Sequence, residues 1–414
     1  MKPYRTPVLF FLGTLVLLYS TVVAAVISTP GTPAHAAVVP HVVPANNPMA
    51  LRGLEDFYNM DYDKSIKEFE ALQKAHPDDP FVTNYLLSSV LFKELYRIGA
   101  LDTESYASDS FIDKKPRLPL DPQTEQRILD LATLATQQSE KLLAKNPTDL
   151  DALYARGVTR GLRSTYMGMA EKAWLGAVKA ALGARRDHDR ILELDPNYVD
   201  AKTLVGIHNY IIGSLSWPLK LGASIIGVTG NKQKGLEYLR QSAKANGLSS
   251  MDAKIALAMF LRREQKYAEA LELVRGMLQA YPRNFLVAVE FANLQNAAGH
   301  GPEAIQSYRG ILESYKGKKY SCSEPELAAY GLGISLRGQR HFDEAAEAFD
   351  MVSGFSNVDK DLRARSSLAA GEMYDTVQKR NKALNKYREV LAFDSNGPSA
   401  DLARRHIKQP YRSQ

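Results

Sequence analysis

The chain has one cysteine, Cys322, among its 414 residues. A single thiol excludes an intramolecular disulfide and any zinc site made of cysteines alone. Catalytic and metal-binding motifs are missing too, because no histidine lies in an H-E-x-x-H sequence and no serine lies in a G-x-S-x-G elbow. We therefore expect no metal site, no cofactor and no catalytic residue, and we interpret Cys322 as an inert loop residue rather than a reactive thiol.

The sequence also has no complete phosphate-binding loop and no block of like charges. The stretch GASIIGVT, residues 222–229, has the spacing of such a loop, but Val228 stands where the loop requires a lysine. The formal net charge is +6, and acidic and basic residues are interleaved. Both features argue against nucleotides and nucleic acid as ligands. With 45% hydrophobic residues, the chain can bury a substantial core.

The first 36 residues predict export across a membrane. Lys2 and Arg5 precede an uncharged apolar run at residues 8–27, and small residues follow at 34–36 with the spacing that signal peptidase prefers. Twenty apolar residues can also span a bilayer, so an uncleaved N-terminal anchor is the alternative to a cleaved signal peptide (residues 1–36). We expect the rest of the chain to be periplasmic or secreted, connected through a Pro-rich tether at 37–48.

Most of the remaining chain consists of helical repeats. Two segments align at an offset of 34 residues, which pairs Ala258 with Ala292 and Ala270 with Ala304. Thirty-four residues is the period of the tetratricopeptide repeat (TPR), in which small residues let two antiparallel helices approach closely. The chain therefore resembles the TPR family. Similar units lie at residues 53–77, 331–352 and 371–394.

The resemblance implies an all-α fold, a right-handed TPR solenoid of about six to seven irregular helical pairs. In the middle of the chain, a helix at roughly 169–194 is longer than the family norm. The expected parts are a first TPR-like unit at 49–98, a long loop at 99–123, divergent central units at 124–250, C-terminal TPR units at 251–395 and a tail at 396–414.

An apolar insertion, GSLSWPLKLGASIIGVTGNKQKG at 213–235, replaces the short turn between two central helices. It is loosely similar to the mitochondrial outer-membrane group related to tetratricopeptide repeat protein 39, and to uncharacterised exported bacterial TPR proteins. Asn231 and Lys232 depart from that pattern, which has an acid–arginine pair there. We interpret the insertion as an extra helix with buried apolar side chains. The alternative is a surface for a partner or a membrane interface, formed by Trp217, Leu221, Ile225 and Ile226.

A second segment, residues 154–174, brings aromatic and cationic side chains together on two helices. Tyr154 and Arg160 are its candidates for binding an acidic or extended partner. Core packing of the aromatic rings and ion pairing of the arginines is the interpretation that we favour. The neighbouring run RRDHDR, residues 185–190, is interpreted as the solvated face of a helix rather than an acid–base site around His188.

In TPR proteins the first helix of each pair lines a concave groove, and the resemblance implies that this groove binds protein or peptide segments. Asparagines three residues apart on one helix face can hold a peptide backbone through their amide groups. The positions in this sequence that match the groove are Arg262, Arg263, Asn293, Asn296, Tyr330 and Arg337.

Together these patterns predict an exported, non-catalytic TPR scaffold that mediates protein–protein interaction in the cell envelope. One alternative is a peripheral membrane-associated envelope protein that uses the 213–235 insertion. Another is an envelope hydrolase or an accessory subunit of an envelope enzyme, with its site in the 99–123 loop or in the insertion.

Overall fold

The computed structural model describes residues 47–101, 116–217, 220–221, 224, 228–245, 247–356 and 358–412. Over these residues every regular element is a helix, which confirms the all-α fold class. The chain divides into two compact units, residues 1–265 and 266–414. The expected export segment, most of the expected tether and the middle of the expected 99–123 loop lie outside the described residues.

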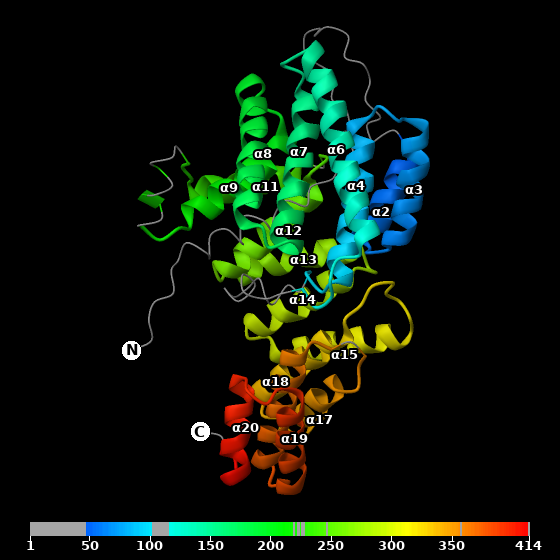
Figure 1. Ribbon diagram of the computed structural model, residues 1–414. Helices are drawn as coiled ribbons and strands as arrows, with labels where there is room; N and C mark the ends of the chain where they lie inside the picture. Colours follow the sequence, from blue (N-terminus) through cyan, green and yellow to red (C-terminus); the bar gives the residue numbers. More distant parts are fainter. Residues whose placement is uncertain are drawn as a thin grey trace. The chain divides into compact units, whose positions relative to one another are not determined.

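The first unit stacks antiparallel helical pairs in chain order (Figure 1). Within each pair a second helix packs against the first, and it also packs against the first helix of the next pair. The pairs are α2 (Pro48–Tyr58) with α3 (Tyr62–Ala75), α4 (Pro80–Arg97) with α6 (Pro122–Lys145), α7 (Leu150–Thr165) with α8 (Trp174–Leu194), and α9 (Val199–Gly213) with α11 (Lys232–Lys244), followed by α12 (Ser250–Arg263). A π-helical turn, Tyr166–Ala170, precedes α8, so this long helix begins later than expected.

The second unit continues the same arrangement. It starts with α13 (Tyr267–Ala280), and its pairs are α14 (Phe285–Ala297) with α15 (Gly301–Lys316), α16 (Pro325–Gly338) with α17 (Phe342–Val352), and α18 (Lys360–Thr376) with α19 (Arg380–Phe393). A last helix, α20 (Pro398–Lys408), packs against both α18 and α19. We had expected residues 396–414 to be a tail, and the structure instead forms this helix within them. Stacked helical pairs in both units confirm the solenoid class.

Side-chain caps and a shared turn define where the helices begin and end. Asp79, Asp121 and Asp149 each accept a hydrogen bond from a backbone N–H in the first turn of α4, α6 and α7. After the first helix of a pair, the chain repeatedly takes a positive φ two residues beyond the helix. This conformation occurs at Met60, Gly99, Gln265, Gly299, Arg340 and Gln378. The repeats therefore share one turn geometry although their sequences differ.

Small residues allow the two helices of a pair to cross closely. A Cβ at Gly235 would lie 2.5 Å from the backbone nitrogen of Tyr210 and 2.6 Å from the carbonyl oxygen of Gly206. A Cβ at Gly333 would lie 2.6 Å from the ring of Phe349, which is fully buried. These distances leave no room for a methyl group, because packed interiors contain few voids. Gly235 therefore lies at a small-residue crossing of α9 and α11.

The first unit closes on itself. The hydroxyl of Tyr58, at the end of α2, donates a buried hydrogen bond of 3.3 Å to Asp252 in α12, across 194 residues of sequence. The central first helices are buried over most of their length: 14 of 18 residues in α4, 11 of 16 in α7 and 11 of 15 in α9. In α14 of the second unit only 6 of 13 residues are buried. In α16 of the same unit 8 of 14 residues are buried and in α18 11 of 17, so α14 is the most accessible of these three first helices.

The two ends of the apolar insertion meet at its base. A Cβ at Gly213 would lie 2.2 Å from the nitrogen of Lys232, and a Cβ at Gly230 would lie 2.4 Å from Cβ of Ile212. The backbone N–H of Asn231 donates to the side-chain oxygen of Asn209 at 3.2 Å. The glycines that flank the insertion thus allow the chain to leave and re-enter the helical pair at one point.

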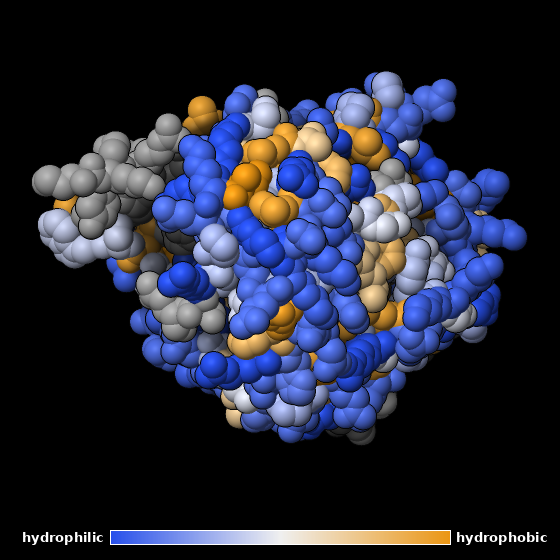
Figure 2. Space-filling view, turned by 90° about the horizontal axis from the view of Figure 1, so that it is seen from below, coloured by the Kyte–Doolittle hydropathy of each residue, from blue (hydrophilic) through white to orange (hydrophobic). Residues whose placement is uncertain are grey.

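Most of the surface seen in Figure 2 is hydrophilic, and the apolar side chains on it form separate patches. This distribution is expected when each helix buries its apolar stripe against its neighbours. The large apolar side chains that are most exposed among the described residues are Leu175 (84%) and Trp217 (75%).

Replacement of Gly235 by alanine tests the helix crossing. The added methyl group would force α9 and α11 apart, so we expect Gly235→Ala to lower the free energy of unfolding by about 1–3 kcal/mol. Gly310→Ala is the control, because Gly310 is a helical glycine with nothing within 4 Å of its Cβ position, and it should be neutral or stabilising by up to about 1 kcal/mol. Chemical denaturation followed by circular dichroism measures both. Equal effects of the two changes would contradict the crossing geometry.

Candidate functional site

The first helices of the second unit are connected by side-chain contacts that run from α14 to α16, α18 and α20. We call this row of contacts the inner ladder. Its positions follow a rule of spacing: Asn296, Arg337 and Asp375 each lie four residues after the small residue at the crossing, which is Ala292, Gly333 or Gly371. Four of the residues predicted for the groove lie on these helices: Asn293 and Asn296 on α14, and Tyr330 and Arg337 on α16.

The two asparagines of α14 are oriented by bonds to their side-chain oxygens. The hydroxyl of Tyr308 donates to Oδ1 of Asn293. The hydroxyl of Ser335, in α16, donates to Oδ1 of Asn296 at 3.1 Å. Each amide oxygen thus accepts a hydrogen bond within the chain, and the Nδ2 amide of each asparagine is a group that can donate to a ligand.

The next two steps of the ladder involve arginines. The guanidinium of Arg365, in α18, lies over the ring of Tyr330 at 5.5 Å, and that of Arg337 lies 5.9 Å from the ring of Phe349. Arg337 is exposed and also interacts with Glu372 in α18. Burial raises the pKa of Glu372, and the nearby Arg337 charge acts in the opposite direction.

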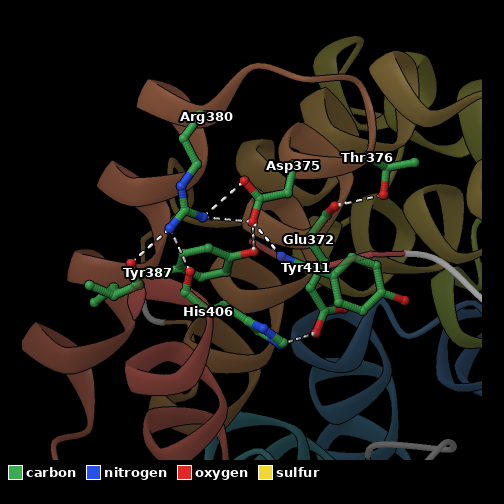
Figure 3. A network of polar contacts seen from close by, with 8 residues as sticks. Glu372, Asp375, Thr376, Arg380, Tyr387, His406 and Tyr411 are labelled. Carbon is green, nitrogen blue, oxygen red and sulfur yellow. Dashed lines mark hydrogen bonds and ion pairs between the residues drawn. The ribbon is translucent and has the colours of Figure 1, made fainter. Parts of the chain in front are cut away.

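The last step is a polar network that holds the C-terminal helix (Figure 3). Asp375, whose side chain is 1% exposed, accepts hydrogen bonds from Arg380 at 2.9 and 3.0 Å, from the hydroxyl of Tyr387 at 2.9 Å and from the backbone N–H of Tyr411 at 2.8 Å. Arg380 also donates to the carbonyl oxygens of His406 and Ile407, at 2.7 and 2.8 Å. One buried carboxylate and one guanidinium therefore tie α18, α19, α20 and the residues after α20 together.

Titratable groups around this network are shifted by burial. Burial and the hydrogen bond to Asp375 raise the pKa of Tyr387, so its hydroxyl stays a donor. Burial lowers the pKa of His406, against the opposite effect of Asp375. Nε2 of His406 lies 3.5 Å from a carboxylate oxygen of Glu372. Burial is the main cause of both pKa shifts, which is typical of a structural network inside the protein.

Two predicted binding residues, Tyr154 and Arg160, belong to α7 in the first unit. Tyr154 is 1% exposed, and its ring packs against Phe81 at 6.0 Å, His188 at 5.3 Å and Tyr198 at 5.8 Å. It therefore does not line an accessible groove. Arg160 bonds to Asp187 at 2.6 Å. The favoured interpretation of this segment, packed rings and paired arginines, agrees with these contacts.

His188 is buried rather than solvated, which corrects our expectation for the helix face at 185–190. A Cβ at Gly157 would lie 2.3 Å from its ring, so the imidazole fills the crossing of α7 and α8. Burial lowers its pKa, and Nδ1 lies 2.9 Å from the carbonyl oxygen of Ala184. Asp187 beside it is also buried, against both Arg156 and Arg160. Arg262 and Arg263 lie in the last turn of α12, in the first unit, and are not part of the inner ladder.

The apolar insertion is exposed where it is described. Trp217 is 75% exposed and Leu221 is 50% exposed, so the expected burial of these two side chains is wrong. Ile225 and Ile226 lie outside the described residues. Lys232, at the end of the insertion, forms an ion pair of 2.8 Å with Glu264.

Within the described parts of the chain, no group of three or more His, Cys, Asp or Glu side chains could hold a metal ion. Over the same parts, none of the helices combines the length and the apolar character that crossing a bilayer requires.

Comparison with known proteins agrees with the repeat. The family model described as tetratricopeptide repeat matches residues 228–285, which confirms the resemblance. No curated protein matches the chain. Among solved structures, human IFIT1 as a dimer with m7Gppp-AAAA is 13% identical, covering 98% of this chain and 88% of that one (TM-score 0.42). Yeast Tom70 is 15% identical over 87% and 88% (0.38), and a tetratricopeptide repeat protein from Parabacteroides merdae is 12% identical over 78% and 97% (0.32).

Several residues of the inner ladder were not identified from the sequence. They are Ser335, Arg365, Glu372, Asp375, Arg380 and His406. Asp375 could have been identified from its position four residues after Gly371, because Arg337 lies four residues after Gly333. Arg380 and His406 carry no repeat signal, because they act through a helix that follows the last pair.

Removal of the Arg380 guanidinium tests the network. Arg380→Met would leave the carboxylate of Asp375 buried without its cation and the last carbonyl groups of α20 without their donor. We expect a loss of roughly 3 kcal/mol in the free energy of unfolding and faster hydrogen exchange in α20. Lys379→Met is the control, because the ion pair of Lys379 with Asp343 is exposed and should contribute less than about 1 kcal/mol. Unchanged exchange in α20 after Arg380→Met would contradict the account.

Proposed function

We propose that this chain, whose helical pairs include a tetratricopeptide repeat at residues 228–285, is a scaffold that binds protein segments on the inner ladder of its second unit. The proposal includes no catalytic step. The observation that carries it is the arrangement of donors on this ladder: the amides of Asn293 and Asn296, with their oxygens already bonded, and the exposed guanidinium of Arg337.

Such a row of donors fits an extended polypeptide. Each residue of an extended chain presents a carbonyl oxygen, and a bound segment must have its backbone groups hydrogen-bonded. Two amide donors on one helix and a guanidinium on the next can bond several acceptors of one segment. Tyr330, on the same helix as Arg337, has its ring under the guanidinium of Arg365.

We further propose that the scaffold works outside the cytoplasm. The support is the sequence pattern of residues 1–36, with a positive start, an apolar run and small residues at the expected cleavage position. A cell-envelope location would place the inner ladder among exported or envelope-bound partners.

Alanine substitution of the donors tests the scaffold. The full-length chain with Asn293→Ala, Asn296→Ala and Arg337→Ala is expressed with an affinity tag in the native host, crosslinked and purified. We expect the partner that copurifies with the unaltered chain to fall at least about tenfold, because each lost hydrogen bond to a partner typically contributes about 0.5–1.5 kcal/mol.

The control carries the same three kinds of change at exposed positions of α19, namely Asn381→Ala, Asn385→Ala and Arg388→Ala. It should retain the partner. Loss of the partner from both forms, or from neither, would argue against recognition by the inner ladder.

A second candidate function is contact with a membrane surface through the insertion, and the exposure of Trp217 and Leu221 favours it. Tryptophan and leucine are typical of the side chains that enter the headgroup region, and Lys220 between them is exposed as well. An interfacial role needs only these side chains and requires no span of the bilayer.

Flotation with vesicles tests this candidate. Residues 37–414 are used, because the apolar run at 8–27 would bind bilayers by itself. We expect Trp217→Ser with Leu221→Ser to reduce the floated fraction about threefold or more, since both lose apolar contact with the lipid. Leu129→Ser with Leu134→Ser, two exposed positions of α6, is the matched control. Equal flotation of both variants and the unaltered domain would exclude the insertion as a membrane contact.

A further inference from the structure

The positive charge of the chain is concentrated at its C-terminal end. Residues 379–412 hold nine Lys and Arg against three Asp and Glu, an excess of six that equals the formal net charge of the whole chain, +6. The residues before this segment are therefore neutral in sum. A field of one sign over a short segment attracts partners of the opposite sign.

Five exposed cations of this segment have no acidic partner among the described residues. Two of them belong to α19, where Lys382 lies over the ring of Tyr374 and Arg388 donates to Asn385. The other three are Arg405 and Lys408 in α20, and Arg412 beyond it. We call these three residues the basic cap. Arg404 beside them is different, because it pairs with Asp401 at 3.0 Å. The dipole of α20 favours cations in its last turn, but Arg412 lies outside the helix and cannot be explained in this way.

The structure fixes the basic cap at the end of the inner ladder. Arg380 holds the last carbonyl groups of α20, and Asp375 accepts the N–H of Tyr411, the residue before Arg412. The ring of Tyr411 packs against His406 at 5.4 Å. The segment that carries these charges is thus attached to α18, where the ladder of donors ends.

We propose that the basic cap binds an acidic segment of a protein partner. Among the described residues of α19, α20 and the chain beyond, no large apolar or aromatic side chain is exposed. Interfacial binding to lipid relies on such side chains, and so does stacking with single-stranded nucleic acid. Carboxylates of a protein need only the charges and donors that are present, and arginine suits them by its planar pair of donors.

This inference deepens the proposed function and rests on it: the segment bound on the inner ladder would have acidic residues at the end that reaches α20. The Nδ2 donors, Arg337 and the basic cap would then act on one polypeptide. Attraction by the cap would mainly raise the association rate and set the direction of the segment.

Fluorescence anisotropy with the full-length chain in neutral detergent tests the proposal. The probes are a labelled glutamate-rich peptide, a labelled single-stranded DNA oligonucleotide and a soluble short-chain phosphatidylglycerol. The variant carries Arg405→Glu, Lys408→Glu and Arg412→Glu. We expect it to bind the peptide at least about tenfold more weakly than the unaltered chain at low salt, with the difference shrinking as salt is raised.

The control reverses three exposed lysines in the last turns of other helices, Lys74→Glu, Lys145→Glu and Lys244→Glu, which changes the net charge by the same amount. It should bind the peptide within about twofold of the unaltered chain. Equal weakening in both variants would overturn the proposal, and so would an effect of the cap variant on DNA or lipid but not on the peptide. A copurified partner that depends on Asn293 and Asn296 but not on the basic cap would refute this inference and leave the scaffold intact.

Discussion

The close crossing of two helices at a small residue is the constraint on which each pair depends. Where Gly206 meets Gly235, the backbones of α9 and α11 touch with no side chain between them. Where Gly333 or Gly371 meets a second helix, an aromatic ring, Phe349 or Tyr387, fills the space that a Cβ would need. The crossing fixes the rotation of both helices about their axes. It therefore also decides which positions of the first helix are turned toward the next pair.

The inner ladder is a consequence of that rotation. Residues four positions after the crossing recur on the same side of successive first helices, as Asn296, Arg337 and Asp375 do. The chain uses these equivalent positions differently along the second unit. In α14 and α16 they bear an amide and an exposed guanidinium, whereas in α18 the buried Asp375 anchors the helix that ends the stack. The equivalent position thus changes from an accessible donor in α14 and α16 to a buried anchor in α18.

The sequence predicted the features that recur in each repeat, and it did not predict features that occur once in the chain. The 34-residue offset predicted the helical pairs, and four of the six groove candidates lie on first helices of the second unit, because local periodicity determines both. The hydrogen bond between Tyr58 and Asp252 joins positions 194 residues apart, and no local pattern predicts such a contact. The exposure of Trp217 was missed because its apolar neighbours indicated burial. Helix α20 was missed because it follows the last helical pair and does not belong to a repeat, so the repeat pattern carries no signal for it.

The central claim is that the inner ladder of the second unit binds a protein segment. A photo-crosslinking amino acid placed at Ile334, the residue after Gly333 in α16, tests it most directly when the full-length chain is expressed in its native host. The same amino acid at Met351, 43% exposed on the second helix α17, provides the comparison. The account predicts a covalent adduct with a partner protein from position 334 and none from position 351. An adduct from position 351 alone, or from neither position, would contradict it.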